Sequence, residues 1–282
     1  MELKQSQRNK VKIKMALQSP SGFGKSISAI LLAQGLCKDD LTKVAVIDTE
    51  AGSSNLYSHL GSYNVLKLES PHSPERYIEA IDVCIKAGME VIIIDSISHC
   101  WDFLLDYHAS LTGNSFVNWS KVKPRQKAFV DKILQSDVHI ICTMRVKQGY
   151  VISEKNGKIV PEKVGLKAIQ RDQISYEFTI VFEIDCKHFA TASKDRTNLF
   201  GGKPQFIINS NTGKKILDWC NSTMTKGELQ IKVTECNNIT ELTELYNKNF
   251  ELAKTIEQDF VSKQKLLHEL TSNINKNGTT NN

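Results

Sequence analysis

Short apolar runs alternate along the first half of the chain with longer segments of helical periodicity. Three of the runs stay almost wholly apolar until they end on polar residues, as expected of strands that are buried on both faces of a parallel sheet. A fourth run at residues 12–17 is followed by an apolar helical pattern at residues 27–36. The three buried runs are residues 43–50, 91–96 and 138–143, and the helical segments between them are residues 74–87, 101–111 and 122–135. This alternation predicts an α/β fold with a mainly parallel, doubly wound sheet.

The pattern changes after Arg145. Two short apolar runs at residues 150–160 flank an Asn-Gly turn signal, which predicts a β-hairpin. Residues 178–185 and 187–192 predict antiparallel strands that extend the sheet late in the chain.

The C-terminal part has a different composition, rich in Thr, Glu, Lys and Asn, with helical patterns at residues 241–249 and 251–270. This part carries no catalytic or ligand-binding motif, so its sequence predicts only a small helical extension. The last residues are polar and low in apolar content, which predicts a disordered tail. The expected divisions are a core at residues 1–222, a helical extension at residues 223–271 and the tail at residues 272–282.

Composition adds little to this picture. The hydrophobic content of 40% and charged content of 24% are those of an ordinary globular protein. No apolar run approaches the length of a membrane span, and the first ten residues lack the apolar stretch of a signal peptide. We therefore expect a cytoplasmic protein with no membrane partner. The seven cysteines form no C-x-x-C pair, which favours buried, reduced thiols over disulfides or a zinc site.

The segment between the first predicted strand and its helix has the pattern of a phosphate-binding loop. Two glycines allow successive backbone N–H groups to converge on phosphate oxygens at a helix N-terminus. Lys25 would reach the β- and γ-phosphates of ATP, and the Ser26 hydroxyl would bind Mg²⁺. Serine replaces the glycine that usually opens the pattern. The loop consists of Ser19, Pro20, Ser21, Gly22, Phe23, Gly24, Lys25 and Ser26.

Carboxylates end two of the buried runs, where ligands bind in a parallel sheet. Asp95 follows four apolar residues and is the candidate second ligand of Mg²⁺. Hydrolysis of ATP also needs a carboxylate to orient or deprotonate the attacking water. Glu50 is the first candidate for this role and Asp48 the second.

Charge is unevenly distributed. Between Lys121 and Arg171 the chain has twelve Lys or Arg against four Asp or Glu, a local net charge of +8, whereas the whole chain has +5. Such a segment suits a polyanion such as single-stranded DNA, although a solvated basic face is the alternative. Tyr150 is a candidate stacking surface. The candidate DNA contacts are Arg145, Lys147, Lys155, Lys158, Lys163, Lys167 and Arg171.

These residues together resemble the RecA-type core ATPases. The resemblance implies that Glu50 activates water, that Asp95 binds the metal, and that Thr143, at the end of the fourth strand, senses the γ-phosphate. Thr143 stands where the family usually has glutamine. Arg145 and Lys147 match the spacing of basic residues that lead into a DNA-binding loop in RecA.

Residues 10–220 look similar to compact phage RecA-like ATPases of the single-strand-annealing group, often labelled AAA-type nucleotide-binding phage proteins. The shared features include Trp119 before a basic helix and the segments at residues 143–147 and 166–178. Lys194 and Arg196 also resemble a Lys-x-Arg pair of ring-forming relatives, which reaches the γ-phosphate bound by a neighbouring subunit. This likeness implies a ring or filament in which hydrolysis requires the oligomer.

The prediction is therefore a RecA-like, Mg²⁺-dependent ATPase that acts on single-stranded DNA in annealing or recombination. It would be encoded by a phage or act in a bacterial host cell, and a phage single-strand-binding protein is a candidate partner. A DNA helicase or motor is one alternative. Another is a regulatory or scaffold module that binds ATP with little hydrolysis, an alternative favoured by Ser19 and Thr143.

Overall fold

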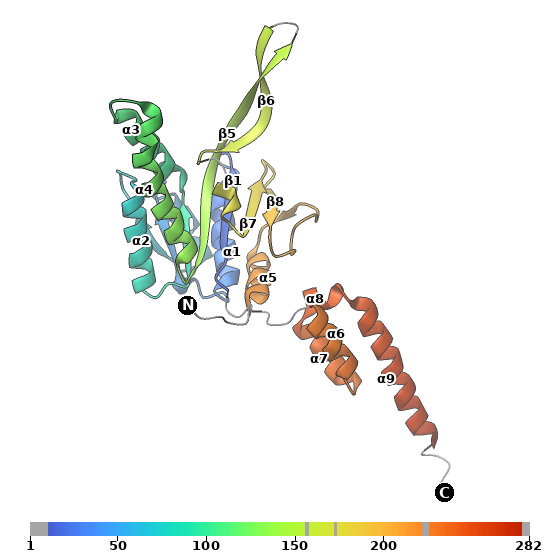
Figure 1. Ribbon diagram of the computed structural model, residues 1–282. Coiled ribbons are helices and arrows are strands. Elements are labelled where there is room, and N and C mark those ends of the chain that lie inside the picture. Colours follow the sequence, from blue (N-terminus) through green and yellow to red (C-terminus); the bar gives the residue numbers. More distant parts are fainter. Residues whose placement is uncertain (1–10, 156–157, 172–173, 222–225, 278–282) are drawn as a thin grey trace, which may run out of the picture. The chain divides into compact units, whose positions relative to one another are not determined.

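A computed structural model describes the fold of the protein over residues 11–155, 158–171, 174–221 and 226–277 (Figure 1). Residues 10–220 form one compact unit, and the helices after residue 225 belong to a second. The two units are described separately below.

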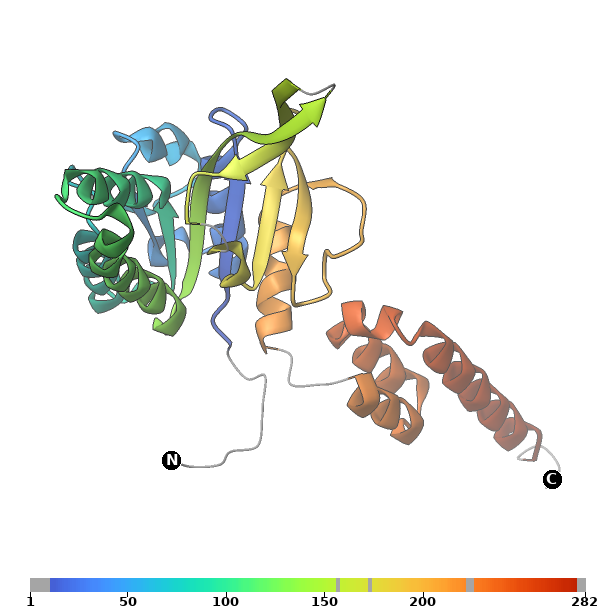
Figure 2. The same cartoon turned by 45° about the horizontal axis from the view of Figure 1, so that its top comes forward.

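The larger unit is built on a mainly parallel sheet with the strand order β3-β2-β4-β5-β1-β7-β8-β9 (Figure 2). Neighbours from β3 to β7 in this order are parallel, and β8 and β9 are added antiparallel. The strands are β1 Lys14–Ser19, β2 Val44–Asp48, β3 Asn64–Lys67, β4 Val91–Asp95, β5 His139–Lys155, β6 Lys158–Ala168, β7 Ile180–Ile184, β8 Phe189–Asp195 and β9 Phe206–Ile207.

Helices cover both faces of this sheet (Figures 1 and 2). One face packs against α1 and α5, and the other packs against α2, α3 and α4. The helices of the larger unit are α1 Lys25–Leu36, α2 Pro74–Lys86, α3 Ser98–Ser110, α4 Ser115–Gln135 and α5 Ser210–Asn221. Short 3-10 helices occur at Leu41–Lys43, Ser53–Leu60 and Ile174–Tyr176.

Strand β1 shows how the sequence divides its side chains between the two cores. Met15 and Leu17 pack on the α1 face, whereas Ala16 between them packs on the opposite face. On the α1 face the backbones of two helices come very close. A Cβ atom at Gly35 would lie 2.1 Å from the carbonyl oxygen of Ser210, so only glycine fits between α1 and α5.

Strand β5 is much longer than its partners. Its first part pairs with β1 and β4 inside the sheet, up to Arg145 opposite Ser19. The second part leaves the sheet and pairs antiparallel with β6, from Val146 opposite Ala168 to Lys155 opposite Lys158. The resulting hairpin extends beyond the carboxyl edge of the sheet (Figure 1).

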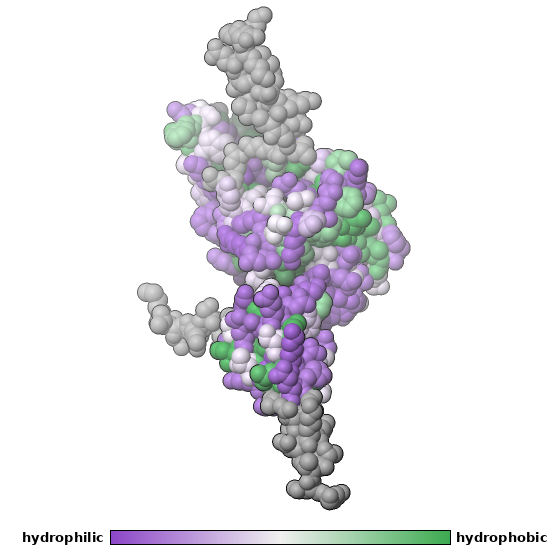
Figure 3. Space-filling model, turned by 90° about the vertical axis from the view of Figure 1, so that its right-hand side faces the viewer, coloured by the Kyte–Doolittle hydropathy of each residue, from purple (hydrophilic) through white to green (hydrophobic). Residues whose placement is uncertain are grey.

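The C-terminal unit is helical and has its own apolar core, with Leu229, Val233 and Phe260 among its buried side chains. The face of these helices that Figure 3 shows is mostly hydrophilic, with small hydrophobic areas. The helices are α6 Lys226–Glu235, α7 Ile239–Lys248, α8 Phe250–Lys254 and α9 Glu257–Asn277. None of the described helices is both long and apolar enough to cross a membrane.

The predicted fold class, a doubly wound and mainly parallel sheet with late antiparallel strands and a C-terminal helical extension, is confirmed. Several boundaries differ. Helix α4 begins seven residues before the predicted start, because the side chain of Asn114 caps it and Pro124 is accommodated inside it. Strand β3 was not predicted because it is an exposed edge strand without a buried apolar run. Helices α5 and α6 were not predicted either.

Two further predictions, of the disordered tail and of the buried cysteines, can be compared with the structure residue by residue. Helix α9 continues to Asn277, past residue 272 where the sequence predicts a disordered tail, and residues 278–282 lie outside the described part. All seven cysteines are free thiols. Six are buried as predicted, and Cys186 is exposed.

Candidate nucleotide-binding site

The predicted phosphate-binding loop lies between β1 and α1, at the carboxyl edge of the sheet. Gly22 and Gly24 have φ angles of 82° and 90°, which L side chains rarely adopt. Ser19 has no such positive φ. Serine therefore replaces the first glycine of the pattern without backbone strain.

The first turn of α1 follows directly from this loop. Its N-cap residue is Gly24, and no side chain caps the helix. The backbone N–H groups of the first turn, together with the helix dipole, are suited to bind an anion.

Lys25 is folded back onto the loop. Its Nζ donates to the carbonyl oxygens of Pro20 at 2.8 Å and Ser19 at 3.0 Å, and the residue is 8% exposed. Burial lowers the pKa of Lys25, although the nearby carboxylates of Asp95 and Glu50 oppose this shift. The structure thus places the ammonium group beside the acidic residues predicted for catalysis.

Asp95 lies at the end of β4 and is 2% exposed. The Ser26 hydroxyl donates to one of its carboxylate oxygens and the Thr143 hydroxyl to the other, each at 2.5 Å. Burial raises the pKa of Asp95, and these two hydrogen bonds oppose the shift. A serine hydroxyl beside a carboxylate is the hard oxygen donor set that Mg²⁺ prefers, so Ser26 and Asp95 fit the predicted metal site.

Glu50 follows β2 and forms a bidentate ion pair with Arg145 of β5. Arg145 Nε donates to Glu50 Oε1 at 2.9 Å, and Arg145 Nη2 donates to Glu50 Oε2. Burial works against ionisation, but hydrogen bonding to Arg145 and its charge outweigh it, so the pKa of Glu50 lies below its ordinary value. Glu50 is therefore held as an ionised carboxylate beside the site.

Asp48, the second candidate for water activation, is hydrogen-bonded within its own loop. Its carboxylate accepts from the backbone N–H groups of Glu50 at 2.7 Å and Ser54 at 3.1 Å, and from the Ser54 hydroxyl at 2.5 Å. Asp48 is 1% exposed. These bonds fix the loop that carries Glu50, so the geometry favours Glu50 over Asp48.

Comparison with known proteins agrees with this geometry. Residues 11–227 match the family model described as an AAA domain. The chain belongs to the AAA domain family. The matched residues include the phosphate-binding loop, Glu50, Asp95 and Thr143.

One solved structure similar to the chain is that of a KaiC-like protein from the hyperthermophilic archaeon Pyrococcus horikoshii. The two have 16% sequence identity and a TM-score of 0.41, over 71% of this chain and 87% of the other. No curated protein matches the chain.

His188 of the AAA domain approaches the phosphate-binding loop, which the sequence did not predict. It lies in the turn between β7 and β8, and its Nδ1 is 3.1 Å from the carbonyl oxygen of Phe23. A Cβ atom at Gly24 would lie 3.1 Å from the same nitrogen. Nothing in the sequence around residue 188 could indicate this contact, because it depends on β7 pairing beside β1.

Lys194 and Arg196, the predicted pair for a neighbouring subunit, do not contact the phosphate-binding loop of their own chain. Lys194 Nζ donates to the carbonyl oxygens of Ser175, at 3.1 Å, and Tyr176. Arg196 Nη2 donates to the same Tyr176 oxygen at 3.2 Å. The AAA domain therefore holds both cations at the end of β8, away from Asp95 and Glu50.

The candidate DNA contacts fall on the β5–β6 hairpin and the segment that follows it. Arg145 is half-buried in its ion pair with Glu50, whereas Lys147 and Arg171 are exposed. Backbone pairing sets Lys147 opposite Lys167, and Lys155 opposite Lys158. The predicted contacts whose side chains lie outside the described part are Tyr150, Lys155, Lys158, Lys163 and Lys167.

Proposed function

We propose that this AAA domain protein hydrolyses ATP to ADP and phosphate in a Mg²⁺-dependent reaction and acts on single-stranded DNA in phage-type annealing or recombination. The observation that carries the proposal is the convergence of residues from α1, β4 and β5 on one carboxylate. Asp95 of β4 accepts from Ser26 of the phosphate-binding loop and from Thr143 of β5.

Each residue of this arrangement has a role in the proposal. The phosphates of ATP lie on the loop, with Lys25 binding the β- and γ-phosphates. Ser26 and Asp95 hold Mg²⁺, which neutralises charge on the phosphate oxygens. Thr143, which touches the same carboxylate, responds to the γ-phosphate.

Glu50 activates the attacking water in this proposal. Its lowered pKa keeps it ionised and able to accept a proton or orient the water. Arg145 holds Glu50 in place and is also a candidate DNA contact, at the point where β5 leaves the sheet. A shift of Arg145 towards a DNA phosphate would release Glu50, which provides a direct route by which DNA changes turnover.

Single-stranded DNA is supported by the local charge of +8 between Lys121 and Arg171, most of which falls on α4 and the hairpin. Binding of this kind weakens steeply as salt rises, because cations are released from the DNA. Self-association is also part of the proposal, and the likeness of Lys194 and Arg196 to the Lys-x-Arg pair of ring-forming relatives supports it. An arginine donated across a subunit interface can raise turnover by several orders of magnitude.

The ATPase rate with and without single-stranded DNA, measured across a salt series, tests the proposal. We expect stimulation by DNA that fades as salt increases. Equal rates in both conditions, with no DNA retained on a filter, would overturn the DNA role and favour the regulatory or scaffold alternative. Directional unwinding of a duplex would favour the helicase or motor alternative.

A further inference from the structure

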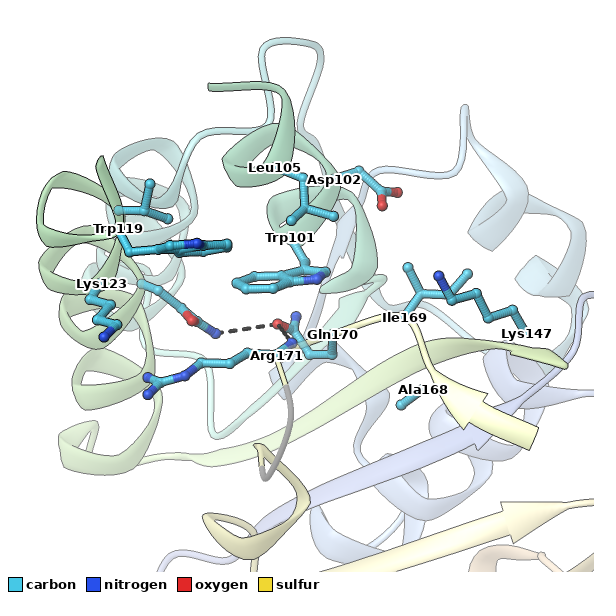
Figure 4. A pocket seen from close by; sticks show the side chains of 12 residues that line it. Trp101, Asp102, Leu105, Trp119, Lys123, Lys147, Ala168, Ile169, Gln170 and Arg171 are labelled. Carbon is cyan, nitrogen blue, oxygen red and sulfur yellow. Dashed lines mark hydrogen bonds between the residues drawn. The ribbon is translucent and has the colours of Figure 1, made fainter. Parts of the chain in front are cut away.

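A cavity of the larger unit is lined by α3, α4, the start of the β5–β6 hairpin and the segment that follows β6 (Figure 4). Its volume is about 560 Å³, within the range of small-molecule pockets. No residue of the phosphate-binding loop lines it. Of its lining residues, only Lys147 and Arg171 were assigned a binding role from the sequence.

Parallel aromatic rings form one wall of this cavity. The centroids of Trp101 and Trp119 are 6.1 Å apart with an interplanar angle of 21°, and His108 stacks on Trp119 at 4.2 Å. Figure 4 shows the two indole rings parallel and offset, with Gln170 and Arg171 across the cavity from them. Both tryptophans are half-buried, so the column of rings has indole surface left for a further flat ring.

The cavity also carries positive charge. Lys123, Lys147 and Arg171 line it and are exposed, against the single carboxylate of Asp102. Aromatic rings with cations around them are the features by which proteins bind single-stranded nucleic acid.

A buried hydrogen-bond acceptor completes the cavity. Gln126 is 3% exposed, and its Nε2 donates to Gln170 Oε1 at 3.2 Å. Gln126 Oε1 has no partner in the part of the chain that the structure describes, although it is buried. An unpaired buried acceptor is costly, and an N–H group of a ligand would satisfy it.

We propose that this cavity, the Trp101–Trp119 pocket, binds a base of single-stranded DNA. The base stacks on the indole rings and donates an N–H to Gln126 Oε1, while the cations at the rim bind the flanking phosphates. The inference rests on the proposed DNA-dependent function and adds a base-binding site at the start of the hairpin, which contributes Lys147 and Ala168 to it. Every base has an aromatic face and N–H groups, so binding at this pocket tolerates different sequences.

Two hydrogen bonds that involve the backbone of Ile97 connect the pocket to the nucleotide site. Gln170 Nε2 donates to the carbonyl oxygen of Ile97 at 3.0 Å, and Ile97 N–H donates to the carbonyl oxygen of Thr143 at 3.1 Å. Ile97 lies two residues after Asp95. Gln170 therefore connects the pocket to the segment that follows the predicted metal ligand.

Intrinsic fluorescence of the full-length protein provides the test. The chain has three tryptophans, and the third, Trp219, packs against the core on the α1 face. In a Trp219→Phe background all tryptophan emission comes from the pocket. We expect oligothymidylate to quench this emission, and an abasic strand of the same length to quench it much less, because it keeps the phosphates and lacks the bases.

Matched variants separate stacking from general charge. Trp119→Ala should weaken binding of fluorescein-labelled oligothymidylate about 5- to 150-fold, the range typical of one stacked base. Trp119→Phe should restore most of the affinity, which would exclude misfolding as the cause. Lys123→Ala should weaken binding more than Lys121→Ala, since both lysines are exposed on α4 but only Lys123 lines the pocket.

Two results would overturn the inference, and they differ. Full affinity of Trp119→Ala together with no quenching would remove the pocket and leave the proposed function intact, with DNA bound by the hairpin. Absence of DNA binding by the wild-type protein with no effect of DNA on ATPase rate would overturn both.

Discussion

Strand β5 connects two regions that differ in whether their polar groups have hydrogen-bond partners within the chain. At the nucleotide edge, the side chains of Lys25, Glu50 and Asp95 all have hydrogen-bond partners within the chain. In the Trp101–Trp119 pocket, a buried amide oxygen has no partner in the described residues, and three cations are exposed. The first region is already organised, whereas the second has polar groups that a ligand would complete.

The difference suggests how each region gains from its ligand. Groups held in place before the reaction need little reorganisation when charge develops, which is the main advantage of a built catalytic site. The pocket instead gains affinity when a ligand satisfies an unpaired acceptor and covers aromatic surface. Substitutions should therefore impair turnover at the nucleotide edge and DNA binding at the pocket.

The broadest effect should come from Lys25→Ala, which should impair both ATP binding and turnover. Among the described residues, Lys25 is the only lysine whose ammonium group contacts the phosphate-binding loop. Loss of a phosphate-binding cation should lower kcat/KM for ATP by at least about 100-fold. Binding of a fluorescent ATP analogue should fall as well. Lys86→Ala, an exposed lysine at the end of α2, is the control and should behave as wild type. Wild-type nucleotide binding by Lys25→Ala would show that this loop is not the phosphate site.

The next effect distinguishes the two carboxylates of one loop. Glu50→Gln should retain ATP binding and lower kcat by about 100- to 10,000-fold, the usual contribution of a general base. Steady-state kinetics and equilibrium ATP binding measure the two properties separately. Normal turnover would remove Glu50 from this role.

Asp48→Asn is the matched comparison. Its carboxylate accepts only bonds that hold the loop, so an amide there should lower the free energy of unfolding by about 1–3 kcal/mol. Urea denaturation measures this loss. A larger fall in kcat than in Glu50→Gln, with unchanged stability, would reverse the assignment of the two residues.

These two carboxylates also show how far the sequence could predict the site. Apolar runs ending on polar residues were sufficient to predict β2, β4 and the start of β5, and hence that Glu50, Asp95 and Thr143 share one edge. The runs could not show which of Asp48 and Glu50 faces the loop backbone, since that depends on the turn after β2. They also could not show the backbone conformation of Ser19.

Contacts between elements distant in the sequence were the least predictable. Trp101, Trp119 and Gln170 come from α3, α4 and the segment after β6, and only the packed structure brings them together. His188 reaches the phosphate-binding loop for the same reason. Local periodicity determines which face of a helix is apolar, but it does not identify the partner of that face.

A smaller effect should appear in the pH dependence of turnover. Arg145 lowers the pKa of Glu50 against the opposing effect of burial. Removing Arg145 leaves the burial, so the pKa of Glu50 should rise. A base with a higher pKa is protonated at higher pH, and the acid limb of kcat for Arg145→Ala should therefore move to higher pH. Arg171→Ala removes an exposed cation instead, and the acid limb of its kcat should stay at the wild-type pH. An unshifted limb in Arg145→Ala would show that another group controls it.

The smallest effect concerns the support of the pocket wall. Arg125 of α4 donates to both carboxylate oxygens of Glu75 in α2, at 2.7 and 2.8 Å, and its guanidinium lies 4.6 Å from the ring centroid of Tyr107 in α3. Because the carboxylate is half exposed, Glu75→Gln should lower the free energy of unfolding by only about 0.5 kcal/mol at neutral pH.

This contribution has a defined pH window. Hydrogen bonding to Arg125 lowers the pKa of Glu75 from 4.5 to about 2. The ion pair therefore stabilises the fold fully above pH 4.5, and its effect is lost as the pH falls towards 2, where the folded protein also binds the proton. Urea unfolding of wild type and Glu75→Gln on both sides of this window should show a difference that disappears at the acid end. A difference that persists there would mean that Glu75 stabilises α2 by packing rather than by its charge.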